Sequence, residues 1–269
     1  MAHQESVQPA TEPNTIPDLA QNIAGLVRRM MLELRPRLID AALTGRRAEN
    51  ENLRHTDNFL SDYDLWMHQR YKDLLVEHIP AFVYASEEAD PEVIGDETDP
   101  DLCVLVDPLD TSELAVRGLY GYTHILIYSR SQARPIIAVV GDIFHHVQLY
   151  LAARDENGTD RAFMITADSI EHTLDQPSQA TLPDALVTNY LMRPEQRFQP
   201  LARQQQFLTA PSAAPGNGKA KGCIGVDFGS VGLCHVATSQ TNHFARSSAR
   251  TPPKRYRPST RLPNQSGQQ

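Results

Sequence analysis

The spacing of apolar positions predicts two helices in the first 80 residues. From Leu19 to Leu38, apolar side chains recur every three or four positions, which is typical of a helix with one buried face. Pro36 lies inside this pattern and should kink or divide the helix, because proline has no N–H to donate. A second helix is predicted over 61–80 and ends at Pro80.

Short apolar runs bounded by turn residues follow the helices and predict strands. In chain order they are FVYAS, LCVLVD, YTHILIYSR, RPIIAVVGDIF and VQLYLAAR. The last three follow one another closely, as in an antiparallel meander. Helices followed by a mostly antiparallel sheet with one inserted helix predict a layered sandwich of the α+β or α/β class.

Composition divides the chain into four parts. Residues 1–16 are polar and rich in proline and are expected to be a disordered leader, whereas 17–166 should form an N-terminal α+β domain. The pattern weakens over 167–243, where the strand candidate DALVTNYL and the glycine turn and helix GSVGLCHVATSQ predict a partial C-terminal α/β domain. Residues 228–269 contain no Asp or Glu, and 244–269 are expected to be a disordered basic tail.

The overall composition excludes several classes of protein. Hydrophobic residues make up 41% of the 269 positions and charged residues 22%, as in globular domains. The net charge of −8 argues against a surface that coats nucleic acid. No apolar run approaches the roughly 20 residues of a membrane span, and the N-terminus lacks the features of a secretory signal. We therefore expect a cytoplasmic protein with three unpaired cysteines and no nucleic-acid or membrane partner.

Four acidic positions carry the candidate chemistry. Asp64 lies near the start of the second predicted helix, Glu87 at the end of a short strand, and Asp107 and Asp110 at the end of the next strand. Because strand ends can bring side chains from separate strands to one point, we expect these carboxylates to converge. Carboxylate oxygens on turns are ligands that suit Mg²⁺, which keeps further positions for water and phosphate oxygens.

The residues next to Asp110 extend this hypothesis. Leu109 would offer its backbone carbonyl to the same ion. Thr111 and Ser112 open a predicted helix, whose first N–H groups and positive dipole end favour a phosphate. A metal site and an anion site would therefore adjoin, which is the arrangement that hydrolysis of a phosphate ester requires.

The same residues also have an ordinary structural interpretation. Asp110 and Glu113 fit a capping box in which Asp110 is the N-cap and Glu113 reaches back. Asp-Pro at the end of a strand is a common turn, and SEEAD alone is typical of a solvated acidic loop. The spacing of the residues does not choose between the two interpretations.

The histidines near these strands are given structural interpretations. His124 lies among apolar strand residues, where a histidine is more often a satisfied core residue than a base. His145 and His146 are adjacent, so they point to opposite faces and are expected in a solvated turn between strands.

At the acidic residues the sequence resembles the inositol monophosphatase-like family of Mg²⁺-dependent, Li⁺-sensitive phosphatases. The matching segments are NFLSDYDLWMHQRYKDLL, ASEEAD and VDPLDTSE, which occur in the family's order, and the resemblance covers roughly residues 19–240. It implies an αβαβα architecture whose second half is incomplete here. It also implies a phosphomonoesterase that acts on a small sugar or cyclitol phosphate, such as an inositol monophosphate, and it is compatible with a homodimer.

The resemblance also implies a ligand set for two Mg²⁺ ions. Glu87, Asp107 and the Leu109 carbonyl would hold the first ion, and Asp107 and Asp110 would share the second. In the family a late Asp, in a Trp-Asp pair, is a further ligand of the second ion. The matching region of this chain is TNHFARSSARTPPKRYRP, which contains no carboxylate.

The remaining roles that the resemblance implies concern water and phosphate. Ser112 stands where the family has the hydroxyl that helps to orient the attacking water, backed by Asp64, with Glu87 as the third catalytic residue. The phosphate would lie on Asp110 and on the amides of Thr111 and Ser112. Glu88 is expected beside the metal rather than on it.

The chain departs from the family's pattern in ways that leave other functions open. Thr111 and Ser86 replace glycines, in addition to the missing Trp-Asp. One alternative is a catalytically silent homologue that binds a phosphorylated ligand or a partner. Another is a phosphatase for a nucleotide 3′-phosphate, a fructose bisphosphate or histidinol phosphate.

Overall fold

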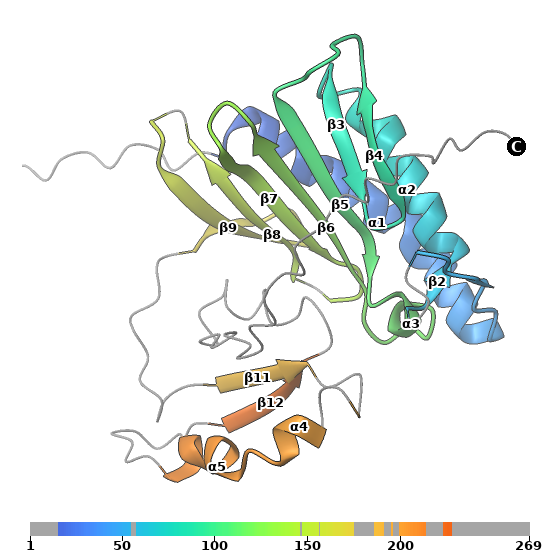
Figure 1. Ribbon diagram of the computed structural model, residues 1–269, viewed down its shortest axis with the longest axis vertical. Coiled ribbons are helices and arrows are strands. Elements are labelled where there is room, and N and C mark those ends of the chain that lie inside the picture. The colour runs from blue at the N-terminus through green and yellow to red at the C-terminus, as the bar shows by residue number, and fades with distance from the viewer. Residues whose placement is uncertain are drawn as a thin grey trace, which may run out of the picture.

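A single eight-stranded sheet dominates the computed structural model, which describes residues 16–54, 58–145, 147–155, 157–174, 186–190, 195, 199–213 and 223–227 (Figure 1). Its strand order is β10-β9-β8-β7-β6-β5-β3-β4, and all neighbours are antiparallel except β3 and β5. The strands are β3 (Phe82–Ser86), β4 (Ala89–Ile94), β5 (Leu102–Asp110), β6 (Tyr122–Ser129), β7 (Arg134–Asp142), β8 (Val147–Arg154), β9 (Asp160–Thr166) and β10 (Glu171–Thr173).

Two long helices, α1 (Asp18–Thr44) and α2 (Asp62–Leu75), pack against one face of this sheet (Figure 1). On β6 the burial alternates, because every second side chain points into the layer between the sheet and the helices. The close approach of α1 depends on Gly141, since a Cβ there would lie 2.8 Å from Met31 Sδ and from Val27 Cγ1. The main core of the described structure lies between these two layers.

Of the two predicted effects of Pro36, a kink or a division of the first helix, the division is wrong, because α1 continues from Asp18 to Thr44 with Pro36 inside it. Pro36 is exposed, whereas Leu34 and Leu38 on either side of it are fully buried. Burial of these two side chains against the sheet therefore outweighs the hydrogen bond that proline cannot donate. The second helix is shorter than predicted and gives way after Leu75 to a turn in which the Ile79 N–H donates to the Leu75 carbonyl.

Three strands of the large sheet, β4, β9 and β10, have no counterpart in the sequence prediction. β4 occupies the edge of the sheet, is mostly exposed and contains Pro91, which is tolerated at an edge because no neighbour needs its N–H. The sequence pattern predicts no element at β9, although β9 pairs with β8 along its whole length. The predicted meander of β6, β7 and β8 is confirmed and extends through β9.

Beyond β10 the structure describes short elements only. Strands β11 (Leu186–Tyr190) and β12 (Cys223–Asp227) form a parallel pair, with α4 (Gln199–Ala202) and α5 (Gln205–Ala213) between them in the chain. β11 coincides with the predicted strand DALVTNYL, whereas GSVGLCHVATSQ, the tail 244–269 and the leader up to residue 15 lie outside the described residues. Between α1 and α2 in the chain, β1 (Glu49–Asn50) and β2 (Leu60–Ser61) form a separate small antiparallel pair.

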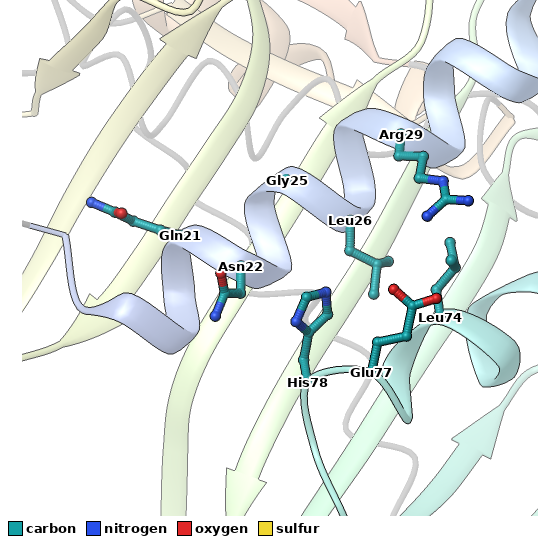
Figure 2. A pocket seen from close by; sticks show the side chains of 8 residues that line it. All are labelled: Gln21, Asn22, Gly25, Leu26, Arg29, Leu74, Glu77 and His78. Atoms are coloured by element: carbon teal, nitrogen blue, oxygen red, sulfur yellow. The ribbon is translucent and has the colours of Figure 1, made fainter.

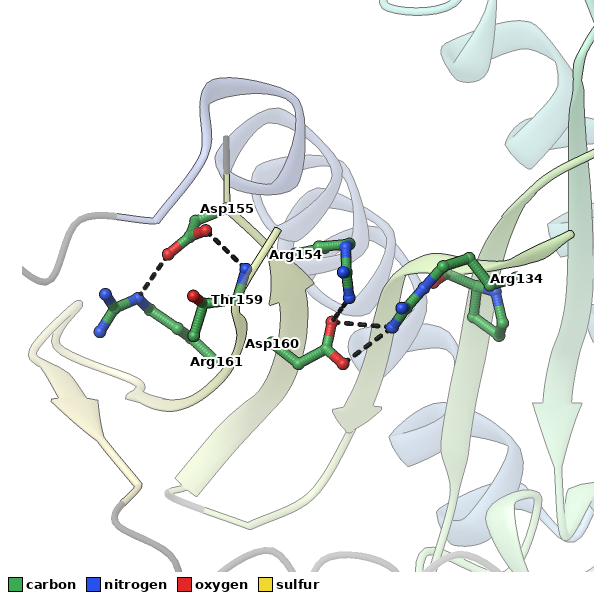
Figure 3. A network of polar contacts seen from close by, with 7 residues as sticks. Arg134, Arg154, Asp155, Thr159, Asp160 and Arg161 are labelled. Carbon is green, nitrogen blue, oxygen red and sulfur yellow. Dashed lines mark hydrogen bonds and ion pairs between the residues drawn. The ribbon is translucent and has the colours of Figure 1, made fainter. Parts of the chain in front are cut away.

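Arginine–aspartate pairs hold together the end of the sheet that lies away from Asp107 and Asp110 (Figure 3). Asp160, the first residue of β9, accepts hydrogen bonds from Arg134 of β7 and from Arg154 of β8 at 2.8–3.0 Å. These pairs are largely exposed and should each add little to stability. No helix in the described part of the chain is long and apolar enough to span a membrane.

Candidate metal and phosphate site

An irregularity in β5 places both of its aspartates on one face of the sheet. In the pairing of β5 with β6, Asp107 lies opposite His124 and Asp110 lies opposite Tyr122, so three steps along β5 match two steps along β6. In a regular strand, residues three apart point to opposite faces, and one extra residue reverses this alternation. Asp107, Asp110 and His124 therefore share a face.

These three side chains form a group of potential metal ligands. Each of Asp107, Asp110 and His124 offers one donor atom, and the three atoms lie within 4.8 Å of one another. His124 Nε2 is 3.4 Å from Asp110 Oδ2. The predicted core position of His124 is wrong, because its side chain is 27% exposed and faces the carboxylates. The register of β6 against β5, which places His124 opposite Asp107, is the feature from which its position could have been inferred.

Negative charge is concentrated at this point. Burial and the neighbouring charge of Asp110 raise the pKa of Asp107 to about 7, and Glu87 and Asp64 act in the same direction. Burial lowers the pKa of His124, but the hydrogen bond to Asp110 and the charge of Asp107 outweigh it, so the pKa is raised overall. Crowded carboxylates of this kind favour a bound cation, because a cation stabilises their charged forms.

Asp64 and Ser112 come from distant parts of the chain and meet beside this group. Asp64 is 2% exposed, and its Oδ2 accepts hydrogen bonds from the Ser61 N–H at 2.7 Å and the Ser61 hydroxyl at 2.6 Å. The Ser112 side chain is buried beside Asp64, and its hydroxyl donates to the Phe59 carbonyl at 3.5 Å. Burial raises the pKa of Asp64 to about 6, although these hydrogen bonds act against it. The structure thus brings together two of the predicted catalytic residues.

The predicted capping box at Asp110 and Glu113 is wrong. The N-cap of the short helix α3 (Ser112–Ala115) is Thr111, which makes no side-chain capping bond, and Glu113 pairs instead with Arg117 at 2.8 Å. Asp110 lies with Asp107 and His124 rather than over the first turn of α3. The capping box in this region is at the start of α2, between Ser61 and Asp64.

Glu87 and Glu88 lie at the end of β3, beside the end of β5. The Glu87 N–H donates to the Val106 carbonyl at 3.4 Å, and the Glu87 carboxylate is exposed and accepts from Asn58 at 3.4 Å. Glu88 is half-buried, and burial together with the charges of Asp64 and Glu87 raises its pKa to about 7. Neither glutamate belongs to the group of three potential ligands, and of the two only Glu88 points into a partly buried environment.

Thr111 adopts a left-handed conformation, with φ 61° and ψ 37°, just before the first amides of α3. A β-branched residue is strained in this region, whereas glycine is not. This geometry explains why a glycine suits the position.

We expect Thr111→Gly to stabilise the protein by about 1 kcal/mol, because the relief of strain exceeds the added entropy of the unfolded chain. It should also tighten binding of inorganic phosphate, since the Cβ beside the amides is removed. Urea unfolding and phosphate titration would check both effects. Ala133→Gly is the matched control, because Ala133 has φ 52° in a distant turn, so only stability should rise. Unchanged phosphate affinity in Thr111→Gly would contradict this account of the turn.

His145 lies in the turn after β7, on the same end of the sheet. Its Nδ1 is 2.9 Å from Oδ2 of the buried Asp142, and about half of its side chain is exposed. His145 therefore lies in a turn, as predicted, with one edge of its ring in solvent and the other against Asp142. His146 lies outside the described residues.

A pocket of about 330 Å³ lies elsewhere, between α1 and the end of α2 (Figure 2). None of the predicted site residues lines it. Its lining residues are Gln21, Asn22, Gly25, Leu26, Arg29, Leu74, Glu77 and His78. The candidate site is therefore defined by converging side chains at the strand ends and not by this pocket.

Comparison with known proteins identifies the fold. No family model matches the sequence, and no curated protein matches it. Among solved structures, the extragenic suppressor protein SuhB from Bartonella henselae has a TM-score of 0.57 and 15% identity, over 84% of this chain and 77% of that chain. Fructose-1,6-bisphosphatase from Leishmania major has a TM-score of 0.54 and 13% identity, over 82% and 72%. An IMPase family protein from Staphylococcus aureus in a Ca-bound form has a TM-score of 0.46 and 18% identity, over 64% and 59%.

The chain therefore has the inositol monophosphatase-like fold, with a mixed α and β architecture, as the sequence predicted. At 13–15% identity the likeness extends to the fold and not to the substrate.

Proposed function

We propose that this protein is a metal-dependent phosphomonoesterase. The observation that carries the proposal is the convergence, at the end of β5, of Asp107 and Asp110 with the buried pair Asp64–Ser112. The fold supports it, because one of the similar structures is a fructose-1,6-bisphosphatase. Since Asp107 and Asp110 share one face of the sheet and Asp64 of α2 acts on the same charge, the carboxylates form a site rather than a solvated acidic loop.

The donor set fits a divalent cation. Asp107 and Asp110 are partly buried and close together, and the charge of Asp110 disfavours the charged form of Asp107, an effect that a bound cation would offset. Glu87, Asp107 and the Leu109 carbonyl would hold a Mg²⁺ ion, and Asp107 and Asp110 would share a second ion. When bound, the ions would polarise the phosphoryl group and make water nucleophilic at neutral pH.

The other residues would position water and phosphate. The hydroxyl of Ser112 lies beside the Asp64 carboxylate, so the two would together hold an attacking water. The amides of Thr111 and Ser112 open α3, and the first amides of a helix have no acceptor within the helix. These amides would bind the phosphate oxygens. We propose a small sugar or cyclitol phosphate, such as an inositol monophosphate, as the substrate, hydrolysed in the cytoplasm.

One observation favours the alternative of a catalytically silent homologue that binds a phosphorylated ligand or a partner. Glu87 is exposed, and the ligand group found among the described residues has only three members. An incomplete ligand set would still bind a phosphorylated ligand through the remaining ion and the amides of α3, without turning it over.

Release of inorganic phosphate tests the proposal. The full chain would be assayed with inositol monophosphates, fructose 1,6-bisphosphate, a 3′-phosphonucleotide and histidinol phosphate, with and without Mg²⁺. We expect Mg²⁺-dependent release from one of them, reduced at least about 100-fold in Asp110→Asn, because loss of a direct ligand should cost more than loss of an outer partner.

Asp160→Asn is the matched control, since it removes an aspartate from the opposite end of the sheet and should leave release unchanged. Equal release by wild type and Asp110→Asn would refute the proposed site. Binding of these phosphates by a folded protein without any release would instead establish the silent homologue.

A further inference from the structure

His124 gives the candidate site a nitrogen donor. The cross-strand pairing places His124 opposite Asp107, and its Nε2 lies 3.4 Å from Asp110 Oδ2. Imidazole nitrogen suits zinc, iron and other first-row transition ions, whereas Mg²⁺ prefers a shell of oxygen atoms alone. A site made of two carboxylates and one imidazole therefore differs in its metal preference from a site made of carboxylates.

The spacing of the donors fits one small ion. Zn²⁺ binds carboxylate oxygen and imidazole nitrogen at about 2.1 Å, so two donors on a tetrahedral ion lie about 3.4 Å apart. The distance between His124 Nε2 and Asp110 Oδ2 is 3.4 Å, and the third donor, from Asp107, lies within 4.8 Å of both. Small side-chain movements would bring all three to a single ion.

Contacts on the other face of β6 hold His124 in place. Thr123 is fully buried next to it, and its hydroxyl lies 2.6 Å from the Tyr71 hydroxyl of α2. The Thr123 hydroxyl also donates to the Asp107 carbonyl at 3.4 Å. Because neighbouring residues of a strand point to opposite faces, fixing Thr123 towards α2 fixes His124 towards Asp107 and Asp110. A ligand held by a rigid strand loses little freedom when it binds.

We propose that Asp107, Asp110 and His124 bind a first-row transition ion, Zn²⁺, at the second metal position of this site. The inference rests on the proposed function, because it names the ion of the same site. To bind, Nε2 of His124 must be unprotonated, so the ring proton is carried by Nδ1.

Metal binding by the full-length, metal-free protein tests this inference separately from catalysis. Co²⁺ serves as a spectroscopic probe, and Zn²⁺, Mn²⁺ and Mg²⁺ are titrated by calorimetry. For wild type we expect a visible Co²⁺ band that saturates and is displaced by Zn²⁺. In His124→Ala the band should be lost and Zn²⁺ affinity should fall at least about 100-fold, while Mg²⁺ affinity changes by about threefold or less.

Two further variants keep the test decisive. His172→Ala removes an exposed histidine from β10 and should behave as wild type. It is the control for metal ions that bind to surface histidines instead of to the site. His124→Asp keeps a ligand but makes the site all-oxygen, so it should bind Mg²⁺ at least as well as wild type and lose the preference for Zn²⁺. Thermal unfolding of each metal-free variant verifies that it is folded.

The inference and the proposed function can fail independently. If Co²⁺ spectra and Zn²⁺ affinities of His124→Ala equal those of His172→Ala, the contact with Asp110 is an ion pair only and the inference is overturned, whatever the phosphate assay gives. If Zn²⁺ binding depends on His124 and no substrate is hydrolysed with any ion, the inference stands and the phosphatase proposal falls.

Discussion

Asp107→Asn is expected to stabilise the metal-free protein by about 2 kcal/mol at pH 8 and to abolish metal-dependent phosphate release. Asp107 is largely buried, and the carboxylates of Asp110, Glu87 and Asp64 all disfavour its charged form. An asparagine has nearly the same shape without the charge, so the repulsion is removed while packing is kept. The folded chain thus retains a carboxylate that costs stability, as expected where a side chain serves binding rather than folding.

The raised pKa of Asp107 determines whether its ionisation increases or decreases the free energy of unfolding. The pKa of Asp107 is about 7 in the folded protein, against 3.8 as the ordinary value. The folded state therefore holds this proton more tightly than the unfolded state does. The contribution to stability is fully present below about pH 4 and is lost as the pH rises towards and through 7. The full difference corresponds to about 4 kcal/mol, of which we expect about half to be recovered, because the buried amide must find new partners.

Urea unfolding of wild type and Asp107→Asn at pH 5 and pH 8, in the presence of a chelator, measures this prediction. The gain in the free energy of unfolding should be larger at pH 8 than at pH 5, and addition of Mg²⁺ should stabilise wild type but not the variant. Asp160→Asn should not stabilise, since Arg134 and Arg154 lower the pKa of Asp160 despite its desolvation. A variant less stable than wild type at pH 8 would mean that the carboxylate has a compensating partner.

The candidate site was predictable from sequence where its residues follow one another in a recognisable order. Asp107, Asp110 and Ser112 lie within six positions of the chain, next to a clear apolar strand. The contact between Asp64 and Ser112, which joins α2 to α3, was expected only from the family resemblance. The structure places the two side chains next to each other, because the fold, and not the local pattern, sets the distance between these helices.

His124 could not be placed in the same way. The residues that follow it on β6 are apolar, and its contact with Asp110 depends on the pairing register and on the extra residue in β5. A bulge leaves no clear mark in the alternation of so short a segment. β4 could not be predicted because a strand at an exposed edge of the sheet needs no apolar alternation. The continuity of α1 could not be predicted because it depends on burial of Leu34 and Leu38 against the sheet, which outweighs the local effect of Pro36.

Gly95→Ala is expected to cause the largest loss of stability, about 3 kcal/mol or more. Gly95 follows β4 with φ 97°, a conformation that side chains rarely adopt, and a Cβ there would lie 2.1 Å from the Pro80 carbonyl oxygen. The next atoms, Ala81 Cα and Cβ, would lie at 2.8 and 2.9 Å. Since these are backbone atoms and a short side chain, no flexible group can move aside. Backbone strain and overpacking each cost about 1–3 kcal/mol.

The matched control for this prediction is Gly25→Ala. Gly25 lies in α1, where a Cβ would meet no atom within 4 Å, so the change should stabilise the helix by about 1 kcal/mol. Thermal and urea unfolding of both variants would give opposite shifts in Tm, with a loss of roughly 6–12 °C for Gly95→Ala. Because Gly95 lies beside the start of β3, and Glu87 follows the other end of that strand, the variant should also weaken metal binding. A Gly95→Ala protein as stable as wild type would show that the chain around Pro80 can move away, and that β3 is held by its pairing with β5 alone.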